Sequence, residues 1–418
     1  MSSLYVYYEN QRVGVFSQDD NLVSSFTYDK HWLCAENSFP LSLAMPLVKE
    51  TFNNRLTLSF FENLLPEGDV RDVLERDHKI HGSYEFLELF GQDCAGAVII
   101  TDDAHFSYEP DNSQVEELSI NTIYEAINKR RSISEVVAQR QSGYLSLAGA
   151  QDKFAAIIKG GALFLPTRGA PTTHIIKTPI LRHGIKESVY NEYFCMELAR
   201  SIGLTTADCY ILEGEHPLFI TQRYDRRIDE NGVVHRLHQQ DLCQAHGLVS
   251  DEKYEIKGGP SIKANYELLL NNVSAMKRIN ALEDYLSWVC FNLLIGNNDS
   301  HSKNLSILLK NNKIELAPFY DLICTALYKC LHKEFSFKIG DRDNFSQIGL
   351  NQFTMLEAEI GLKKGAITRR MKNIRERVLA HKETVLDVIM NKHQKAKICK
   401  RISTLIERRA KGLSQQGL

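Results

Sequence analysis

Residues 296–304 read Gly-Asn-Asn-Asp-Ser-His-Ser-Lys-Asn and directly follow the apolar stretch 281–295, whose spacing predicts a long buried helix. In this loop, Asp299 precedes Asn304 by five residues. The spacing alone is a weak signal, because turns are generally rich in Asp and Asn. A carboxylate and an amide at the end of a buried helix are nevertheless a candidate polar site, whose meaning depends on the segments around it.

The segment that follows strengthens this candidate, because it predicts a short hairpin. Apolar residues 305–309 and 314–317 flank an Asn-Asn turn, and Pro-Phe-Tyr-Asp follows at 318–321. Antiparallel strands joined by a tight turn bring the residue before the first strand beside the residue after the second. We therefore expect Asn304 and Asp321 to lie close together, with the two aromatic residues before Asp321 as its apolar anchor.

The rest of the chain changes pattern twice. The first hundred residues mix hairpin and helical patterns, the region from about 143 to 240 is β-rich with one helix at 188–202, and the chain beyond is mostly helical. Ser188 is placed to cap that helix and Gly203 to end it. A β-rich lobe followed by a helical lobe with a hairpin is typical of kinases. We therefore expect an α+β, two-lobed protein-kinase-like fold with an appended amino-terminal α+β module.

The 418 residues are enough for two to three packed units. The polar stretch 102–117 is the best boundary, and it predicts an amino-terminal module at 1–110, a β-rich lobe at 118–240 and a helical lobe at 241–418. The nine cysteines form no C-x-x-C pair, and the chain shows neither a signal-peptide pattern nor an apolar run long enough to span a membrane. A cytoplasmic protein with reduced thiols and no zinc site is expected.

Charge is unevenly distributed along the chain. The net charge is -2, yet residues 363–411 hold 16 Lys and Arg against 4 Asp and Glu. A basic stretch on a helical pattern can contact nucleic acid or an acidic partner. A solvated helix face is an equally good explanation from the sequence.

The residues of the loop and hairpin suit phosphoryl transfer, which needs a phosphate cradle, metal ligands and a group that orients the attacking hydroxyl. Kinase catalytic loops have the same Asp-x-x-x-x-Asn spacing, so Asp299 is a candidate base, and Asn304 and Asp321 are candidate Mg²⁺ ligands. Lys177 ends a predicted strand and could bind ATP phosphates, with Glu192 on the next helix as its partner. A surface Lys at a strand edge is the alternative, but these five residues occur in the chain order of kinases.

The phosphate cradle is less evident, because the common glycine-rich motifs are absent. Residues 146–153 read Ser-Leu-Ala-Gly-Ala-Gln-Asp-Lys immediately before a predicted strand. The small residues at 148–150 let backbone N–H groups approach an anion, and Lys153 could add charge. Taken alone, this stretch could also be an ordinary turn.

Several segments together resemble the HipA family of serine/threonine-protein kinases, which are the toxin halves of bacterial toxin–antitoxin pairs. Their order and separation match that family over nearly the whole chain. The segments are Phe-Phe-Glu-Asn-Leu-Leu-Pro at 60–66, the stretch at 146–153, Pro-Thr-Thr-His-Ile-Ile-Lys at 171–177, Gln-Gln-Asp-Leu-Cys-Gln at 239–244, Asp-x-His-x-Lys-Asn at 299–304 and Pro-Phe-Tyr-Asp at 318–321.

The resemblance implies an ATP- and Mg²⁺-dependent serine/threonine kinase. Asp299 would be the base, His301 would contact the γ-phosphate, and Lys303 belongs to the same catalytic set; a structural loop histidine is the alternative for His301. The residues implied to bind nucleotide or metal are the phosphate loop Ala148, Gly149, Ala150, Gln151, Asp152 and Lys153; Lys177 and Glu192; the adenine hinge Gln240, Asp241 and Leu242; and His301, Asn304 and Asp321, of which the last two hold the metal.

Regulation and partners also follow from the resemblance. Ser146 is similar to the family's autophosphorylated serine, whose modification expels the phosphate loop, and the added charge would be repelled by the triphosphate site. Family members bind a small dimeric helix-turn-helix antitoxin, HipB-like, and operator DNA through it. Some members phosphorylate an aminoacyl-tRNA synthetase, which halts translation and leads to growth arrest and persistence.

Two alternative functions remain open. A small-molecule phosphotransferase of the aminoglycoside-kinase type uses a related Asp-x-x-x-x-Asn loop. A catalytically idle scaffold could serve as corepressor with a DNA-binding partner. The complete set of Lys177, Asp299, Asn304 and Asp321 argues against the scaffold, because a scaffold does not need all four.

Overall fold

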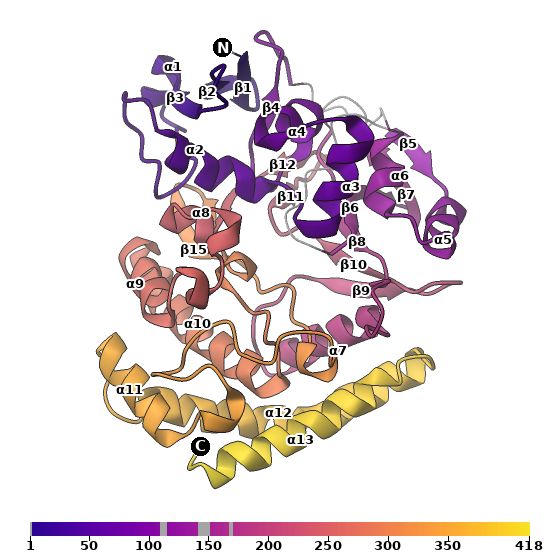
Figure 1. The fold of residues 1–418 in the computed structure, drawn as a ribbon, viewed down its shortest axis with the longest axis vertical. Helices are drawn as coiled ribbons and strands as arrows, with labels where there is room; N and C mark the ends of the chain where they lie inside the picture. Colours follow the sequence, from indigo (N-terminus) through magenta and orange to yellow (C-terminus); the bar gives the residue numbers. More distant parts are fainter. Residues whose placement is uncertain (1, 109–114, 141–150, 167–169) are drawn as a thin grey trace. The chain divides into compact units, whose positions relative to one another are not determined.

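The described chain consists of two groups of densely contacting residues. The computed structural model describes residues 2–108, 115–140, 151–166 and 170–418 (Figure 1). Unit 1 comprises Met1–Thr178, Glu213–Ser250 and Ile307–Lys313, and unit 2 comprises Pro179–Leu212, Asp251–Ser306 and Ile314–Leu418. Across the described residues, no helix combines the length and the apolar character needed to cross a membrane.

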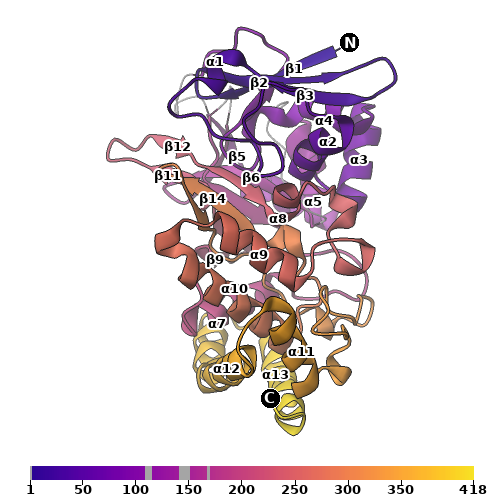
Figure 2. The ribbon, with the colours of Figure 1, turned by 90° about the vertical axis from the view of Figure 1, so that its left-hand side faces the viewer.

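The amino-terminal part of unit 1 is an antiparallel sheet with the order β3-β2-β1-β4, with helices packed beside it (Figure 2). The ring of Phe16 in the sheet stacks on Phe61 of a helix at 4.5 Å between centroids, and both rings are fully buried. The elements are β1 (Ser2–Tyr8), β2 (Gln11–Gln18), β3 (Ser24–Tyr28), α1 (Lys30–Leu33), α2 (Asn54–Phe61), α3 (Gly68–His78), α4 (Gly82–Phe90) and β4 (Ile99–Thr101).

The second sheet of unit 1 carries the strands predicted in the β-rich region. Within the unit its order is β5-β7-β6-β8-β10. Alternating apolar residues such as Phe154 and Ile176 are fully buried, which explains why these segments form strands. The elements are β5 (Val115–Leu118), α5 (Ile120–Asn128), α6 (Ile133–Ala138), β6 (Lys153–Lys159), β7 (Ala162–Pro166), β8 (His174–Lys177), β10 (Leu218–Gln222), β11 (Arg226–Ile228), β12 (Val234–Arg236), β13 (His238–Asp241) and α8 (Leu242–His246).

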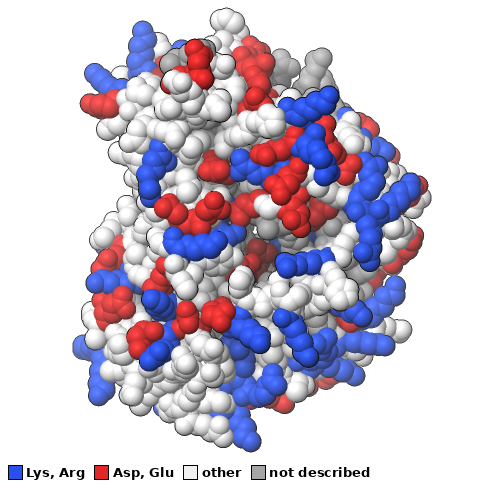
Figure 3. Space-filling view, in the orientation of Figure 1, with Lys and Arg blue, Asp and Glu red and all other residues white. Residues whose placement is uncertain are grey.

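Unit 2 is mainly helical, as predicted for the carboxyl-terminal half. Its central helix, α10, has every residue from Tyr285 to Ile295 buried, and Trp288 lies at its core with no exposed surface. The elements are α7 (Ser188–Ser201), β9 (Cys209–Leu212), α9 (Ile262–Asn272), α10 (Ala275–Ile295), α11 (Leu350–Ile360), α12 (Ala366–Lys392) and α13 (Ile398–Gln415). Lys and Arg side chains gather over α12 and α13 (Figure 3). The predicted hairpin, β14 (Ser306–Lys310) and β15 (Lys313–Leu316), contains a boundary between the units.

For α7, the predicted N-terminal cap is wrong, whereas the glycine predicted to end the helix is confirmed. The N-cap of α7 is Glu187 rather than Ser188, because the Ser188 hydroxyl accepts a hydrogen bond from the Ile180 backbone N–H at 2.9 Å. At the other end, Gly203 has a φ of +83°, and its N–H donates to the Arg200 carbonyl at 2.9 Å. This left-handed conformation is the one that glycine adopts without strain after a helix.

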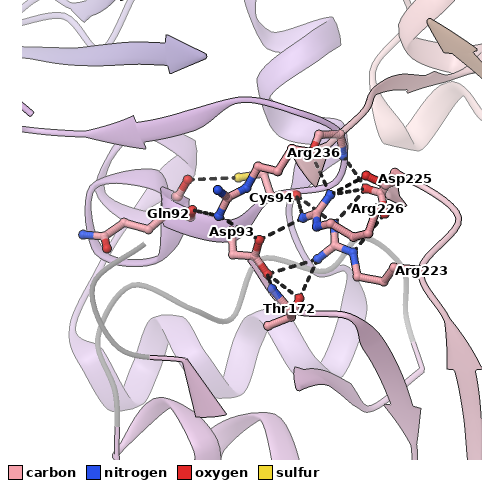
Figure 4. A network of polar contacts seen from close by, with 10 residues as sticks. Gln92, Asp93, Cys94, Thr172, Arg223, Asp225, Arg226 and Arg236 are labelled. Carbon is pink, nitrogen blue, oxygen red and sulfur yellow. Dashed lines mark hydrogen bonds and ion pairs between the residues drawn. The ribbon is translucent and has the colours of Figure 1, made fainter. Parts of the chain in front are cut away.

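The units differ from the three predicted divisions of the chain. Residues 179–212, expected in the β-rich lobe, belong to unit 2, and the amino-terminal sheet groups with the second sheet in unit 1. A buried network of polar contacts joins the two sheets of unit 1: Asp93, just before β4, bonds Arg223, Arg226 and Arg236 (Figure 4). The boundary at 102–117 stays a prediction.

Candidate active site

The loop with the predicted base leaves α10 through a turn that requires glycine. Gly296 has a φ of +75°, and a Cβ at this position would lie 2.8 Å from Cβ of Ala326. The Gly296 carbonyl accepts from the Ala326 N–H at 2.9 Å. One turn earlier, Arg409 donates to the Leu293 carbonyl through Nε at 3.0 Å and Nη2 at 2.7 Å, which satisfies the helix end. Contacts with Ala326 and with Arg409 therefore fix the position of the loop.

Asn297 connects the loop to the segment that carries Asp321. Its Nδ2 donates to Asn292 Oδ1 at 2.8 Å and to the Asp321 carbonyl at 3.4 Å. Its Oδ1 accepts from the Asp299 backbone N–H at 3.2 Å, and its carbonyl accepts from the Ser300 hydroxyl at 3.0 Å. A single buried amide thus fixes the predicted base relative to a predicted metal ligand.

Asn304 and Asp321 flank the hairpin as expected, and contacts of their chain neighbours close its base. The Tyr320 hydroxyl donates to the Lys303 carbonyl at 2.7 Å, and the Ala317 N–H donates to the Ser306 carbonyl at 2.9 Å. Asp321 has a φ of +58°, a conformation that is uncommon outside glycine and that clusters at functional sites.

These two residues have the donor chemistry that Mg²⁺ requires. Nδ2 of Asn304 donates to the Asp299 carbonyl at 2.9 Å, so the amide oxygen is the atom that could act as a ligand. One carboxylate and one amide oxygen leave further positions for phosphate oxygens and water. Among the described residues, no group of three or more His, Cys, Asp and Glu side chains could hold a metal ion.

Asp299 is reachable from solvent, since its side chain is 54% exposed. Two residues of the same unit lie next to its carboxylate. The Tyr254 hydroxyl donates to Oδ1 at 2.5 Å, and Nε2 of the buried His301 lies 4.0 Å from the same oxygen. The rings of Tyr254 and His301 meet edge to face, with centroids 5.1 Å apart. Lys303, from the same predicted set, is buried.

In unit 1, two predicted phosphate-binding lysines lie on neighbouring strands. Lys153 of β6 and Lys177 of β8 are direct partners in the antiparallel pairing, so their side chains share one face of the sheet. Lys177 is buried, and its Nζ lies 5.6 Å from the centre of the Phe219 ring. Their predicted role in binding the phosphates of ATP stays a prediction.

Other predicted nucleotide ligands in unit 1 have side chains engaged in structural contacts. The Asp152 carboxylate accepts from the N–H groups of Ile133 at 2.7 Å and Ser134 at 3.1 Å, so it caps α6. Gln240 accepts from the Leu43 N–H at 2.9 Å, and Asp241 forms the capping box of α8. The nucleotide-binding roles of Asp152, Gln240 and Asp241 stay predictions.

The remaining predicted ligands are located as follows. Leu242 is buried at the start of α8, and Gln151 Nε2 donates to the Thr178 carbonyl at 3.4 Å. Ser146, Ala148, Gly149 and Ala150 lie outside the described residues. Glu192 is buried on α7 in unit 2, whereas Lys177 belongs to unit 1, so their ion pair stays a prediction.

Helix α7 holds the chain just beyond Asp321. Asn191 Nδ2 donates to the Cys324 carbonyl at 3.0 Å, and its Oδ1 accepts from the Cys324 N–H at 2.8 Å. Burial raises the pKa of the Cys324 thiol to about 12, so this cysteine is not a nucleophile at neutral pH. Cys324 is a free, buried thiol with a structural role.

The sequence analysis missed two residues of this site. Asn297 is adjacent to the loop, and the Asn-Asn pair before Asp299 was a signal that could have identified it. Tyr254 lies 45 residues before Asp299, and no local pattern connects the two. Only the folded chain brings that hydroxyl to the carboxylate.

Replacing Asn297 with alanine should slow phosphoryl transfer by about 10²-fold, because small displacements of positioned groups cost that much. The KM for ATP should change little. Asn298→Ala is the matched control, since the Asn298 side chain is also buried but donates to the His332 carbonyl at 3.1 Å. Steady-state kinetics on both variants would contradict the assignment if kcat fell equally in the two.

Comparisons with known proteins identify the family of the chain. The HipA-like C-terminal domain family matches residues 145–382, which is more than half of the chain, and the HipA N-terminal domain family matches residues 4–101. The chain belongs to the HipA family. The family assigned from the sequence motifs is thereby confirmed.

Named relatives of this HipA-family chain are kinases. A Sinorhizobium fredii protein named "Putative kinase Y4mE" is 36% identical over 89% of each chain. The serine/threonine-protein kinase toxin HipA of Shewanella oneidensis is 27% identical over 84% of this chain and 81% of its own. HipA in the solved Shewanella oneidensis complex of HipA, HipB and operator DNA matches with a TM-score of 0.83, at 24% identity over 99% of this chain and 97% of its own. That match confirms the α+β kinase-type fold.

Proposed function

We propose that this HipA-family chain transfers the γ-phosphoryl group of ATP to serine or threonine side chains of proteins. The observation that carries the proposal is the arrangement in unit 2, where Asn297 links the exposed Asp299 to the segment of Asp321 and where the hairpin closes beside Asn304. A base beside two oxygen ligands is what phosphoryl transfer requires of a protein.

Each residue has a distinct role in the proposed reaction. Asp299 accepts the proton of the attacking hydroxyl at a carboxylate oxygen, while Asn304 and Asp321 hold Mg²⁺. Bound Mg²⁺ neutralises charge on the phosphate oxygens. Lys153 and Lys177 bind the phosphates of ATP, and His301 contributes a donor near the transferred group. His301 and Lys303 are buried, and electrostatic contacts of buried groups with phosphate are stronger than the same contacts in water.

Radiolabelled ATP distinguishes this proposal from the alternatives. The purified chain is incubated with Mg²⁺, γ-labelled ATP and a bacterial extract, and the label is then counted in protein and in small molecules. Label on protein phosphoserine or phosphothreonine is the expected result. Label confined to small molecules would indicate a small-molecule phosphotransferase, and label in neither fraction would indicate an idle scaffold.

The toxin role rests on the family. In this proposal the chain acts in the cytoplasm, phosphorylates a translation component such as an aminoacyl-tRNA synthetase and arrests growth. Phosphorylation of Ser146 by the chain itself would end its activity, and a HipB-like antitoxin dimer would neutralise it. Expression of wild type and Ser146→Ala without antitoxin should arrest growth, with the longer arrest in the variant.

Contact with operator DNA through the antitoxin complex predicts a salt-dependent contribution from α12. Arg370 and Arg375 of the basic run 369–377 bond within unit 2, whereas Arg369, Lys372 and Arg377 are exposed. Neutralising the three exposed residues to Gln should reduce the slope of log K against log[salt] by up to about 3, since each phosphate contact contributes about 0.9. An unchanged slope in a DNA-binding titration of the complex would exclude this contact.

A further inference from the structure

The proposed catalytic base already holds a hydroxyl group of the chain itself. The Tyr254 hydroxyl donates to Asp299 Oδ1 at 2.5 Å, and the Asp299 side chain is otherwise 54% exposed. A general base must lie about 2.6–3.2 Å from the hydroxyl whose proton it takes. Tyr254 therefore occupies one of the two carboxylate oxygens that an acceptor hydroxyl could use.

The backbone around Tyr254 is fixed by hydrogen bonds, whereas its side chain can be displaced. Its backbone segment is anchored, because Oε2 of the neighbouring Glu255 accepts from the Lys338 N–H at 2.8 Å and the Gly259 N–H donates to the Tyr254 carbonyl at 2.9 Å. The side chain itself is only half-buried. A rotation of the phenol would free the carboxylate without unfolding the segment.

Two lysine side chains and the ring of His301 also lie next to the Tyr254 ring. Lys253 and Lys257 place their Nζ atoms 5.5 Å and 5.8 Å from the centre of the Tyr254 ring, and His301 meets the ring edge to face. Cations over an aromatic face stabilise the ring in place. These contacts involve the ring, so a phenylalanine would keep them and lose the bond to Asp299.

We propose that Tyr254 is a specificity-determining residue that blocks Asp299 until a protein acceptor hydroxyl displaces the phenol. This inference rests on the proposed role of Asp299 as the base. Water is a poor competitor for the position, because it brings no other contacts to offset the lost charge-assisted hydrogen bond. The block would suppress wasteful ATP hydrolysis while the chain has no protein acceptor.

ADP release with Mg-ATP and water alone tests the proposal, with every protein carrying Ser146→Ala so that phosphorylation of Ser146 neither consumes ATP nor ends the activity. Tyr254→Phe should raise this rate by about tenfold, since a hydrogen bond to a charged group is lost. Tyr266→Phe on α9 is the control, and its rate should equal that of the wild type. A synthetic peptide of residues 139–153, which contains Ser146, adds a second readout, with a lower KM for the peptide and an unchanged KM for ATP expected in Tyr254→Phe.

Combining Tyr254→Phe with Asp299→Asn separates this inference from the proposed function. The rise in ADP release should vanish in the double variant. An unchanged or lower rate in Tyr254→Phe, or a rise that persists without the Asp299 carboxylate, would overturn the blocking role. Wild-type ADP release and phosphoryl transfer in Asp299→Asn alone would instead overturn the role of Asp299. Nucleotide titration of each variant verifies that it is folded and binds ATP.

Discussion

Asp299→Asn should lower the rate of phosphoryl transfer to protein by about 10²–10⁴-fold, the range that general base catalysis contributes. The amide keeps the size of the side chain and can still accept the Tyr254 hydroxyl, but it cannot take a proton. The Asp299 backbone contacts to Asn297 and Asn304 do not involve the carboxylate, so the loop should keep its conformation. Titration with a fluorescent ATP analogue should give an unchanged dissociation constant.

A control carboxylate makes this result specific. Asp387→Asn removes another exposed negative charge, on α12 of the same unit, and its transfer rate should match that of the wild type. A similar decrease in both variants would point to a general effect of charge. An Asp299→Asn variant that retains full activity would show that another group accepts the proton.

Asp93→Asn should reduce the free energy of unfolding by about 3–5 kcal/mol, the usual consequence of removing one partner from a buried ion network. Figure 4 shows the reason, because Asp93 lies among three arginines that come from well beyond it in the chain. Oδ1 bonds Arg226 at 2.8 Å and Arg236 at 3.2 Å, and Oδ2 bonds Arg223 at 3.1 Å. Asp225 still pairs with Arg223 at 2.8 Å and with Arg226 at 3.0 Å, but the loss of the Asp93 carboxylate removes a buried negative charge from this cluster of arginines.

The ionisation of Asp93 follows from the same contacts. Burial alone would raise the pKa of Asp93, but the charges of Arg223, Arg226 and Arg236 outweigh it and hold the pKa below its ordinary value. Burial and the charge of Arg223 lower the pKa of Arg226 to about 10. A carboxyl group with a lowered folded-state pKa stabilises the fold at neutral pH, and this contribution is lost as the pH falls below about 4.

Urea unfolding checks the expectation for Asp93, with Asp229→Asn as the control. Asp229 also bonds a basic side chain, His235 at 2.8 Å, but this pair lies on the surface of the β11–β12 hairpin. The urea concentration at the midpoint of unfolding should stay at the wild-type value in Asp229→Asn, whereas it should be clearly lower in Asp93→Asn. Equal midpoints for the two variants would show that the buried network does not hold the sheets of unit 1 together.

The local elements could be predicted from the sequence because their signals are local. Period-two alternation identified β1 and β2, and the Asn311-Asn312 turn between apolar runs identified the hairpin β14–β15. The same hairpin led to the placement of Asn304 and Asp321, because a tight turn leaves little freedom to its flanks. In each case the decisive residues lie within a few positions of one another.

The features that were not predicted depend on contacts between distant residues. Asp93 and Arg223 are separated by 130 positions, and Tyr254 and Asp299 by 45. Neither pair has a signature in spacing or periodicity. Ser188 failed as a cap for a related reason, since its hydroxyl accepts from Ile180, which lies eight residues earlier on the incoming loop. Rules based on neighbouring residues cannot predict which of several possible hydrogen-bond partners a side chain will choose.

The central claim is that this HipA-family chain is a protein kinase with Asp299 as its base. Intact-mass spectrometry of the wild type and of Asp299→Asn after incubation with Mg-ATP tests it most directly, with the modified residue mapped in each. We expect phosphate on Ser146 in the wild type and none in the variant, although both bind ATP. Equal phosphorylation of the two proteins, or none in either despite ATP binding, would contradict it.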